Sequence, residues 1–113
     1  MRPSRELVAA STRPLILAIL ARGESYGYAI IQQVRDLSGG QWEWTEGMLY
    51  PVLHRLEREG LVRSRWVASE SGRQRKYYRL QKDGNRALEA ESRQWALAHS
   101  MLARLMETKP CST

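Results

Sequence analysis

Near Gly60 the sequence changes from helical to strand periodicity, and this change limits the folds that the chain can adopt. Before it, apolar residues recur every three or four positions and predict a helix from Thr45, its cap, to about Glu59. The stripe that would face a core comprises Leu49, Val52, Leu53 and Leu56. After Gly60, residues 61–67 and 76–80 are rich in β-branched and aromatic side chains, which predicts two strands. The small, polar link between them is prone to turn, so we expect a β-hairpin.

Two shorter helices are predicted upstream. The hydroxyls of Ser11 and Thr12 and the ring of Pro14 are typical of a helix start, and the buried helix they predict ends near Gly23. Ser25 is expected to cap the next helix.

The second helix has apolar residues at helical spacing and is expected to end at Gly39 and Gly40. The bulk of Trp42 and Trp44 then indicates a packed link or a short strand, to which we assign no site.

From Asp83 to Thr108 the chain is predicted to form one long helix, which Pro110 stops. Its residues alternate at intervals of three and four in a seam with one polar member, comprising Leu88, Glu91, Trp95, Ala98, Leu102 and Leu105. A monomer of this size could not bury the stripe, so we expect two copies to pair along it.

Three helices followed by a hairpin predict a winged helix-turn-helix, mainly α with a β-hairpin wing and a long C-terminal dimerisation helix. We expect residues 1–81 to form a DNA-binding domain and residues 82–113 to form the dimerisation helix and a short tail. In this fold the third helix enters the major groove, and two-fold symmetry places the two recognition helices about 34 Å apart on a palindromic operator.

The positive charge of the chain is concentrated in one segment. The formal net charge is +6, and the stretch from Arg55 to Arg86 alone contains ten basic and four acidic residues. Its densest part, residues 73–79, has four cations and no acid. Concentrated charge with interleaved aromatics indicates a polyanion partner, and the alternative is a solvated surface that keeps the protein soluble.

The polar face of the helix over 45–59 supplies candidate DNA contacts. At 100° per residue, Tyr50 and His54 lie opposite the apolar stripe and are expected to contact base edges, and Arg55 and Arg58 to contact bases or phosphates. Further candidates are Thr45 and Glu46 at the helix N-terminus, whose free amides favour phosphate, and Arg73, Arg75, Lys76 and Tyr77 in the wing. A simpler role for Glu46 is as a first-turn acid that favours the helix dipole.

Two wing aromatics have structural interpretations. Tyr77 and Tyr78 alternate across a strand, so we expect one to be buried and the other to reach a phosphate. Trp66, in the first strand, is expected to pack in the core or within the wing.

The segment 45–62, TEGMLYPVLHRLEREGLV, resembles the PadR family of bacterial transcriptional regulators. Gly27 and Tyr28, residues 75–80 and Gly84 after the wing agree with this resemblance, which covers about residues 12–108. It implies a dimeric winged-helix repressor of nearby genes, often relieved by a small molecule. The family's DNA contacts would correspond to Tyr50, His54, Arg55 and Arg58, to Arg73, Arg75 and Lys76 in the wing, and to Ser25 and Tyr26 at the start of the second helix.

The short C-terminal segment is similar to the compact branch of that family. In multidrug-binding members of the branch, a tryptophan on this helix pairs with its mate and stacks flat aromatic ligands, and Trp95 falls at that place. The resemblance thus implies an aromatic or hydrophobic effector near Trp95, Ser92 and His99, whereas the residues alone favour plain dimer packing. Gln81 replaces the family's helix-capping threonine, so we expect the cap to move to Asp83.

Other classes of function have less support. Two distant histidines and Cys111 in the tail make neither a metal site nor a nucleophile–base pair, so we expect no enzyme and no cofactor. No apolar run approaches the roughly 18 residues of a membrane span, which favours a cytoplasmic protein. The main alternative is a winged-helix interaction module whose basic face binds an acidic protein; RNA binding comes third.

Overall fold

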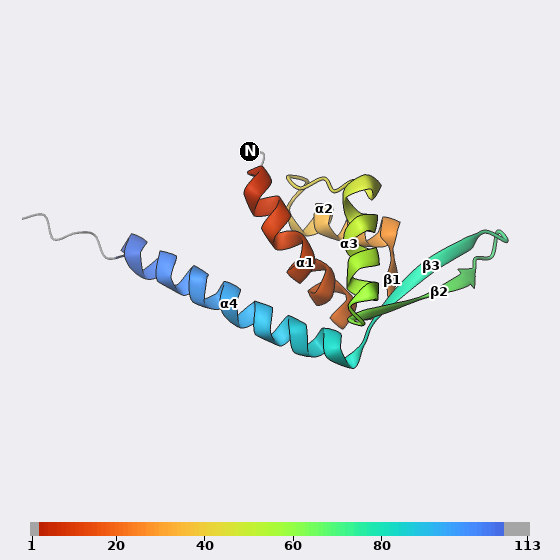
Figure 1. Cartoon of the computed structure of the whole chain (residues 1–113). Helices are drawn as coiled ribbons and strands as arrows, with labels where there is room; N and C mark the ends of the chain where they lie inside the picture. The colour runs from red at the N-terminus through yellow and green to blue at the C-terminus, as the bar shows by residue number, and fades with distance from the viewer. Residues whose placement is uncertain (1–2, 108–113) are drawn as a thin grey trace, which may run out of the picture.

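The structure, a computed structural model, describes residues 3–107 (Figure 1). Its helices are α1 (Arg5–Ala21), α2 (Gly27–Leu37), α3 (Glu46–Arg58) and α4 (Lys82–Glu107). The strands β1 (Ser25–Tyr26), β2 (Val62–Ala68) and β3 (Gln74–Leu80) form an antiparallel sheet in the order β1–β3–β2. The predicted fold class is confirmed: the molecule is a mainly helical winged helix-turn-helix with a hairpin wing and a long C-terminal helix. Thr108, Pro110 and Cys111 lie outside the described residues.

The helix α3 follows the sequence prediction closely. The Thr45 hydroxyl caps it by accepting a hydrogen bond from the backbone nitrogen of Met48 at 3.2 Å. Leu49, Leu53 and Leu56 are fully buried in the core that α1, α2 and α3 form with the base of the hairpin. The apolar stripe therefore fixes which face of α3 turns outward.

The helix α1 begins earlier than predicted, at Arg5 instead of near Pro14, which lies inside the helix. Ser4 is the cap, and its hydroxyl accepts a hydrogen bond from the backbone nitrogen of Leu7. Ser11 and Thr12 are buried, and both hydroxyls donate to the carbonyl oxygen of Val8, at 3.2 and 2.6 Å. The prediction of a cap was wrong because hydroxyls that bond back to the preceding turn resemble start signals in the sequence.

The prediction for Ser25 was also wrong. Ser25 and Tyr26 form β1, whose residues lie opposite Tyr78 and Tyr77 of β3, and α2 begins at Gly27 without a side-chain cap. Trp42 and Trp44 lie in a segment without regular structure, so the alternative of a short strand there is wrong and that of a packed link holds.

The start of α4 packs tightly against the hairpin. Gly84 is buried, and a Cβ at this position would lie 3.0 Å from Cγ of Leu80 and closer still to the carbonyl oxygen of Leu61. The carbonyl oxygen of Gln81 accepts the hydrogen bond from the backbone nitrogen of Asn85, so Gln81 occupies the cap position. Asp83 lies in the first turn of α4, and the prediction that it caps the helix was wrong.

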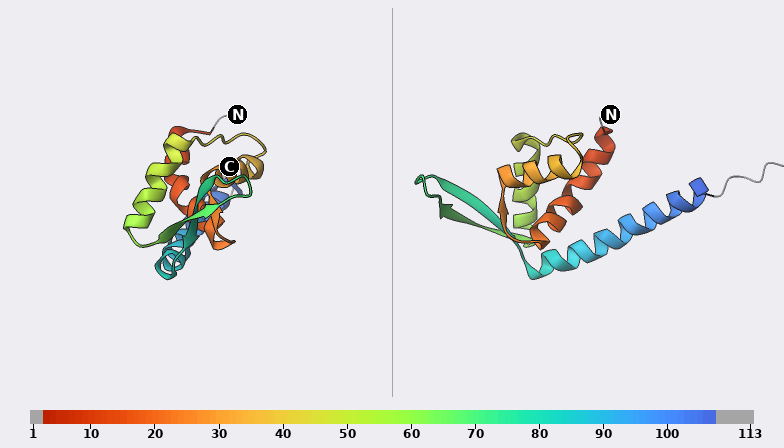
Figure 2. Two further views of the ribbon diagram at one scale, coloured as in Figure 1. Left: turned by 90° about the vertical axis from the view of Figure 1, so that its right-hand side faces the viewer. Right: turned by 180° about the vertical axis from the view of Figure 1, so that it is seen from behind.

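The wing and α4 project from the helical body on opposite sides, as Figures 1 and 2 show. None of the helices in residues 3–107 combines the length and apolar character that a membrane span requires. The same part of the chain holds no group of histidine, cysteine and carboxylate side chains suited to a metal ion.

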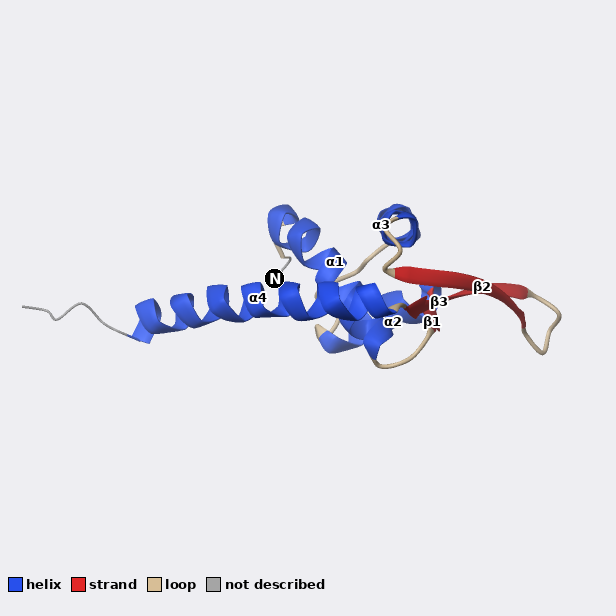
Figure 3. Cartoon of the chain, turned by 60° about the horizontal axis from the view of Figure 1, so that its bottom comes forward, coloured by secondary structure: helices blue, strands red, loops and turns tan. Residues whose placement is uncertain are grey.

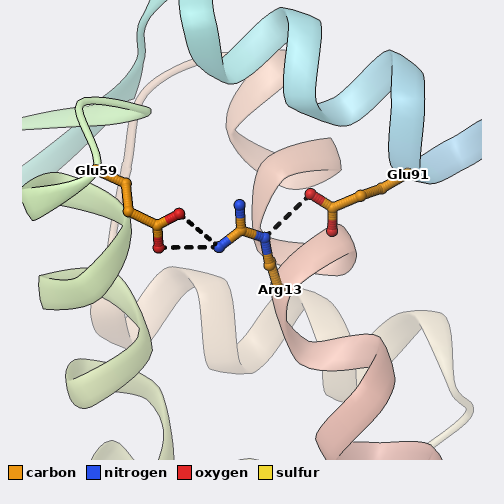
Figure 4. A network of polar contacts seen from close by, with 3 residues as sticks. All are labelled: Arg13, Glu59 and Glu91. Atoms are coloured by element: carbon orange, nitrogen blue, oxygen red, sulfur yellow. Dashed lines mark hydrogen bonds and ion pairs between the residues drawn. The ribbon is translucent and has the colours of Figure 1, made fainter.

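Arg13 links α1, the end of α3 and α4 through ion pairs (Figure 4). Arg13 of α1 donates from Nη1 to both carboxylate oxygens of Glu59, at the C-terminal end of α3, at 3.2 and 3.0 Å. From Nε it donates to Glu91 of α4 at 3.0 Å. The hydrogen bond to Glu59 is the main cause that raises the pKa of Arg13 above its ordinary value. The orientation of α4 is thereby tied to that of α3.

Candidate nucleic-acid interface

A groove runs between α3, the start of α2 and the hairpin, and we call it the α3–hairpin groove. It is lined by Tyr26, Gly27, Tyr28, Glu46, Tyr50, His54, Trp66, Arg73, Gln74, Arg75, Lys76 and Tyr78. The structure thus brings Tyr26, Glu46, Tyr50, His54, Arg73, Arg75 and Lys76, all predicted from the sequence, to one surface. Residues far apart in the chain meet there because β1 pairs with β3 beside α2.

The remaining predicted DNA contacts lie outside this lining. Arg55 borders a different groove between α1 and α3, together with Val8 and Val52, and Arg58 is exposed near the end of α3. Ser25 is half-buried in β1, Thr45 is occupied as the cap of α3, and Tyr77 packs edge-on against Tyr26 with ring centroids 5.1 Å apart.

The side chain of Tyr50 packs against the backbone of α2 at Gly27. A Cβ on Gly27 would lie 2.8 Å from Cζ of Tyr50, so a larger residue at this position would force the tyrosine ring to move. His54 follows one turn later, with its ring centroid 6.3 Å from that of Tyr50. This packing leaves Tyr50 half-buried and His54 exposed along the outward face of α3.

Two cations of the hairpin, Arg75 and Lys76, contact aromatic rings, whereas Arg65 of β2 pairs with the carboxylate of Glu24. The guanidinium of Arg75 lies 4.6 Å from the ring centroid of Tyr26. The Lys76 ammonium lies between two rings, 5.9 Å from that of Trp66 and 5.7 Å from that of Tyr78. Within residues 3–107, neither these two cations nor Arg73 form an ion pair with a carboxylate. Their positive charge therefore remains available to an anionic partner.

The base of the hairpin is fixed to α3 by a carboxylate. Oε2 of Glu57 accepts hydrogen bonds from the hydroxyl and the backbone nitrogen of Ser64, at 2.6 and 3.1 Å. The hydroxyl contact is the largest of the effects that lower the pKa of Glu57 below its ordinary value. Of the two wing tyrosines, Tyr78 is the fully buried one, and burial raises its pKa to about 12, so it stays neutral.

Sequence reasoning missed Trp66, which was expected to be packed. Its side chain is 64% exposed and lines the α3–hairpin groove opposite Lys76. The missed signal is its register: Ser64, two positions earlier on the same face, contacts α3, so Trp66 also faces the groove but lies beyond the reach of the helix.

The helix α4 presents an apolar face that is exposed to solvent in the structure of residues 3–107. Leu88 is half-buried against the core and Glu91 pairs with Arg13. Farther along, the predicted dimer residues Trp95, Ala98, Leu102 and Leu105 are all exposed, Trp95 at 40%. Of the predicted effector contacts, His99 is exposed, and the Ser92 hydroxyl donates to the carbonyl oxygen of Glu89.

The comparisons with known proteins agree with this architecture. The sequence model described as "Transcriptional regulator PadR-like family" matches residues 16–90, and the chain belongs to this family. It is 37% identical, over 79% of each chain, to "Transcriptional regulator Rv3488" of Mycobacterium tuberculosis.

Two solved structures are similar to the whole described fold. A PadR family transcriptional regulator from Eggerthella lenta superposes with a TM-score of 0.77 at 34% identity, covering 92% of this chain and 88% of that one. A transcriptional regulator from Clostridium thermocellum gives a TM-score of 0.81 at 26% identity, covering 90% and 96%. The protein is therefore a transcriptional regulator of the PadR family and not an enzyme.

Proposed function

We propose that this regulator is a homodimeric repressor that binds double-stranded DNA at a palindromic operator, acting on the chromosome in the cytoplasm. The observation that supports DNA binding most directly is the α3–hairpin groove. There, Arg73, Arg75 and Lys76 of the hairpin form no ion pair with a carboxylate within residues 3–107, and they share the groove with the outward face of α3. Double-stranded DNA fits both features, because its phosphates pair with the cations and its major groove is wide enough to admit an α-helix.

In this proposal each element has its own part of the duplex. The helix α3 enters the major groove, where Tyr50 and His54 reach base edges and Arg55 and Arg58 reach bases or flanking phosphates. Thr45 and Glu46 bring the N-terminus of α3, with its free amides, to a phosphate. The backbone contacts of β1, α2 and the hairpin come from Ser25, Tyr26, Arg73, Arg75, Lys76 and Tyr77.

The exposed seam of α4 supports the proposal of a dimer. A contiguous apolar surface on a helix that projects from the body is typical of an interface, and a second copy supplies a seam of the same composition. We assign residues 1–81 to DNA binding and residues 82–113 to the dimerisation helix and tail. The seam residues Leu88, Trp95, Ala98, Leu102 and Leu105 then lie between the two copies.

A flat aromatic effector between the two Trp95 rings, bordered by Ser92 and His99, would favour one angle between the paired helices. Arg13 connects α4 to α3, so a change of this angle reaches the recognition helix. The effector shifts the equilibrium only if it prefers one dimer geometry. In the test, Trp95→Ala should still dimerise but no longer respond to flat aromatic compounds that release the wild-type protein from DNA. Unchanged release would show that Trp95 is not the platform.

The first test is binding of the purified chain to DNA from its own upstream region, beside a random duplex of equal length at near-physiological salt. Fluorescence anisotropy should show specific binding about 10³-fold tighter than random. Equal and weak binding to both duplexes would contradict recognition of that region. Protein capture on an immobilised wild-type chain, with the R73Q/R75Q/K76Q variant as the control, would then test the alternative of an acidic protein partner.

A further inference from the structure

The side chain of Trp66 is exposed on the one face of the hairpin that turns toward the recognition helix. Its cross-strand partner in the sheet is Lys76. Ser64, on the same face of β2, is hydrogen-bonded to Glu57 of α3. Residues two apart on a strand share a face, so Trp66 continues the α3-facing surface at the point where α3 no longer covers it.

Nothing within the described chain buries this indole. It is 64% exposed, and the Lys76 ammonium lies 5.9 Å from the ring centroid. Lys76 itself is half-buried and has no carboxylate within ion-pair distance in residues 3–107. The pair therefore offers one large apolar plate and one positive charge, side by side, on the rim of the α3–hairpin groove.

A ligand for this pair must present an anion next to an apolar ring. The backbone of DNA has this pattern, because each phosphate is joined to a deoxyribose whose carbon atoms are apolar. We propose that Trp66 and Lys76 form a backbone clamp: the ammonium pairs with one operator phosphate while the indole packs on the adjoining deoxyribose. The clamp rests on the proposed DNA binding and adds to it a contact that is apolar and independent of base sequence.

The two halves of the clamp are expected to differ in their dependence on salt. The slope of log affinity against log salt is negative, and removal of one phosphate contact makes it less steep by about 0.9. Removal of an apolar contact leaves the slope unchanged. Lys76→Gln removes one phosphate contact from each copy of the dimer, so we expect it to make the slope less steep by about 1.8. Trp66→Ala should weaken binding by roughly 5- to 30-fold at every salt concentration. This loss lies in the lower part of the range expected when a base–aromatic stack is removed. Trp66→Phe, which keeps an aromatic ring, should lose less.

The experiment measures anisotropy of labelled operator and of labelled random duplex with the full chain at four salt concentrations. Leu37→Ala is the matched control, because this apolar side chain is equally exposed, at 65%, but lies at the far end of α2 from Gly27. Thermal unfolding of each variant shows whether the fold is retained. A similar loss for Trp66→Ala on both duplexes, with wild-type slope, supports the clamp. A loss on the operator alone overturns it, because Trp66 would then contact bases.

A second measurement observes the Trp66 side chain directly in the wild-type chain. The chain has four tryptophans, and incorporation of 5-fluorotryptophan gives each a ¹⁹F resonance. Trp66→Phe identifies the Trp66 line, and the buried Trp44 is the internal reference. Addition of operator should shift the Trp66 line and leave that of Trp44 in place. If wild-type protein binds operator while the Trp66 line and the affinity of Trp66→Ala stay unchanged, the clamp is wrong and DNA binding stands. If wild-type protein binds no DNA, both proposals fall together.

Discussion

The hairpin and α4 extend from opposite ends of the helical body (Figure 3). Their exposed side chains differ in chemistry. The hairpin exposes Arg73 and Arg75, neither of which forms an ion pair with a carboxylate within residues 3–107. Beyond Glu91, α4 exposes a run of apolar side chains that includes Leu97 and Leu102. Exposure of a cation to water costs little free energy, whereas a contiguous apolar surface exposed to water is unfavourable and is typical of an interface. This difference agrees with the proposed roles: reversible binding of DNA at the hairpin and lasting contact with a second copy at α4.

The two projections are also attached to the body in different ways. The hairpin is fixed to α3 by the hydrogen bonds between Glu57 and Ser64. The start of α4 is held by close packing at Gly84 and by the ion pair of Glu91 with Arg13. A movement of α4 can therefore be transmitted to α3 through the contacts of Arg13 with Glu91 and Glu59.

The largest effect is expected where α4 is most apolar. Leu102→Asp places a carboxylate from each copy in the proposed seam, and an unpaired charge buried there is strongly unfavourable. The dimer should weaken by about 10³-fold or more, which corresponds to roughly 4 kcal/mol. Sedimentation of the variant and the wild type over a range of concentrations measures this change.

The control for that variant lies on the opposite side of the same helix. Ser100 is exposed, and at 100° per residue it points away from the seam. Ser100→Asp adds the same charge and should leave the dimer intact. Equal weakening by both substitutions would place the interface elsewhere, and a wild-type chain that is monomeric at all concentrations would contradict the dimer.

The next largest effect is expected at the joint between the hairpin and α4. Gly84→Ala would force the new methyl group against the Leu61 carbonyl and the Leu80 side chain. The overpacking should lower the free energy of unfolding by about 2 kcal/mol. Urea denaturation measures the loss, and Asn85→Ala, exposed one residue later, should change stability little. A stable Gly84→Ala variant would mean that α4 can shift on the hairpin without loss.

The parts of the fold that the sequence predicts are those defined by local signals. The Thr45 cap, the stripe ending at Leu56 and the small turn residues of the hairpin all lie close together in sequence and need no tertiary context. The strand β1 could not be predicted, because two residues carry no periodicity and Ser25 is extended only through its pairing with Tyr78. The start of α1 was predicted wrongly because the Thr12 hydroxyl donates its hydrogen bond within the helix and does not cap it.

The candidate interface shows the same limit. Helical spacing places Tyr50 and His54 on the outward face of α3, and they line the groove. It cannot show that Arg55 turns toward α1, because that depends on where α1 packs. Nor can it show which face of β2 carries Trp66, because this follows from a contact between Ser64 and α3.

A smaller effect is expected at the junction of three helices. Arg13→Gln removes the ion pairs with Glu59 and Glu91, all of which keep partial contact with water. We therefore expect a loss of only about 1 kcal/mol in the free energy of unfolding. Arg22→Gln, an exposed arginine one residue beyond α1, is the control and should be neutral.

The coupling of α4 to α3 through Arg13 can be measured separately from the contribution of Arg13 to the free energy of unfolding. Double-mutant cycles of Arg13→Gln with Glu59→Gln and with Glu91→Gln give the two pair energies, which are expected to be similar. In dimeric protein bound to an effector, Arg13→Gln should also reduce the release of operator. Full release by this variant would show that α4 acts on α3 by another route.

The smallest effect separates the hairpin attachment from that of α4 by its pH dependence. The pKa of Glu57 is lower in the folded chain than its ordinary value, so its contribution to stability is present above the unfolded-state pKa and is lost as pH falls through the folded-state pKa. Ser64→Ala removes the hydroxyl donor and should cost about 1 kcal/mol at pH 7. Because a protonated Glu57 no longer gains from that donor as a charged acceptor, the difference between variant and wild type should shrink at acidic pH. Urea denaturation at pH 7 and pH 3 measures both values, and an equal difference at the two pH values would mean that Ser64 stabilises the hairpin by packing and not through the Glu57 carboxylate.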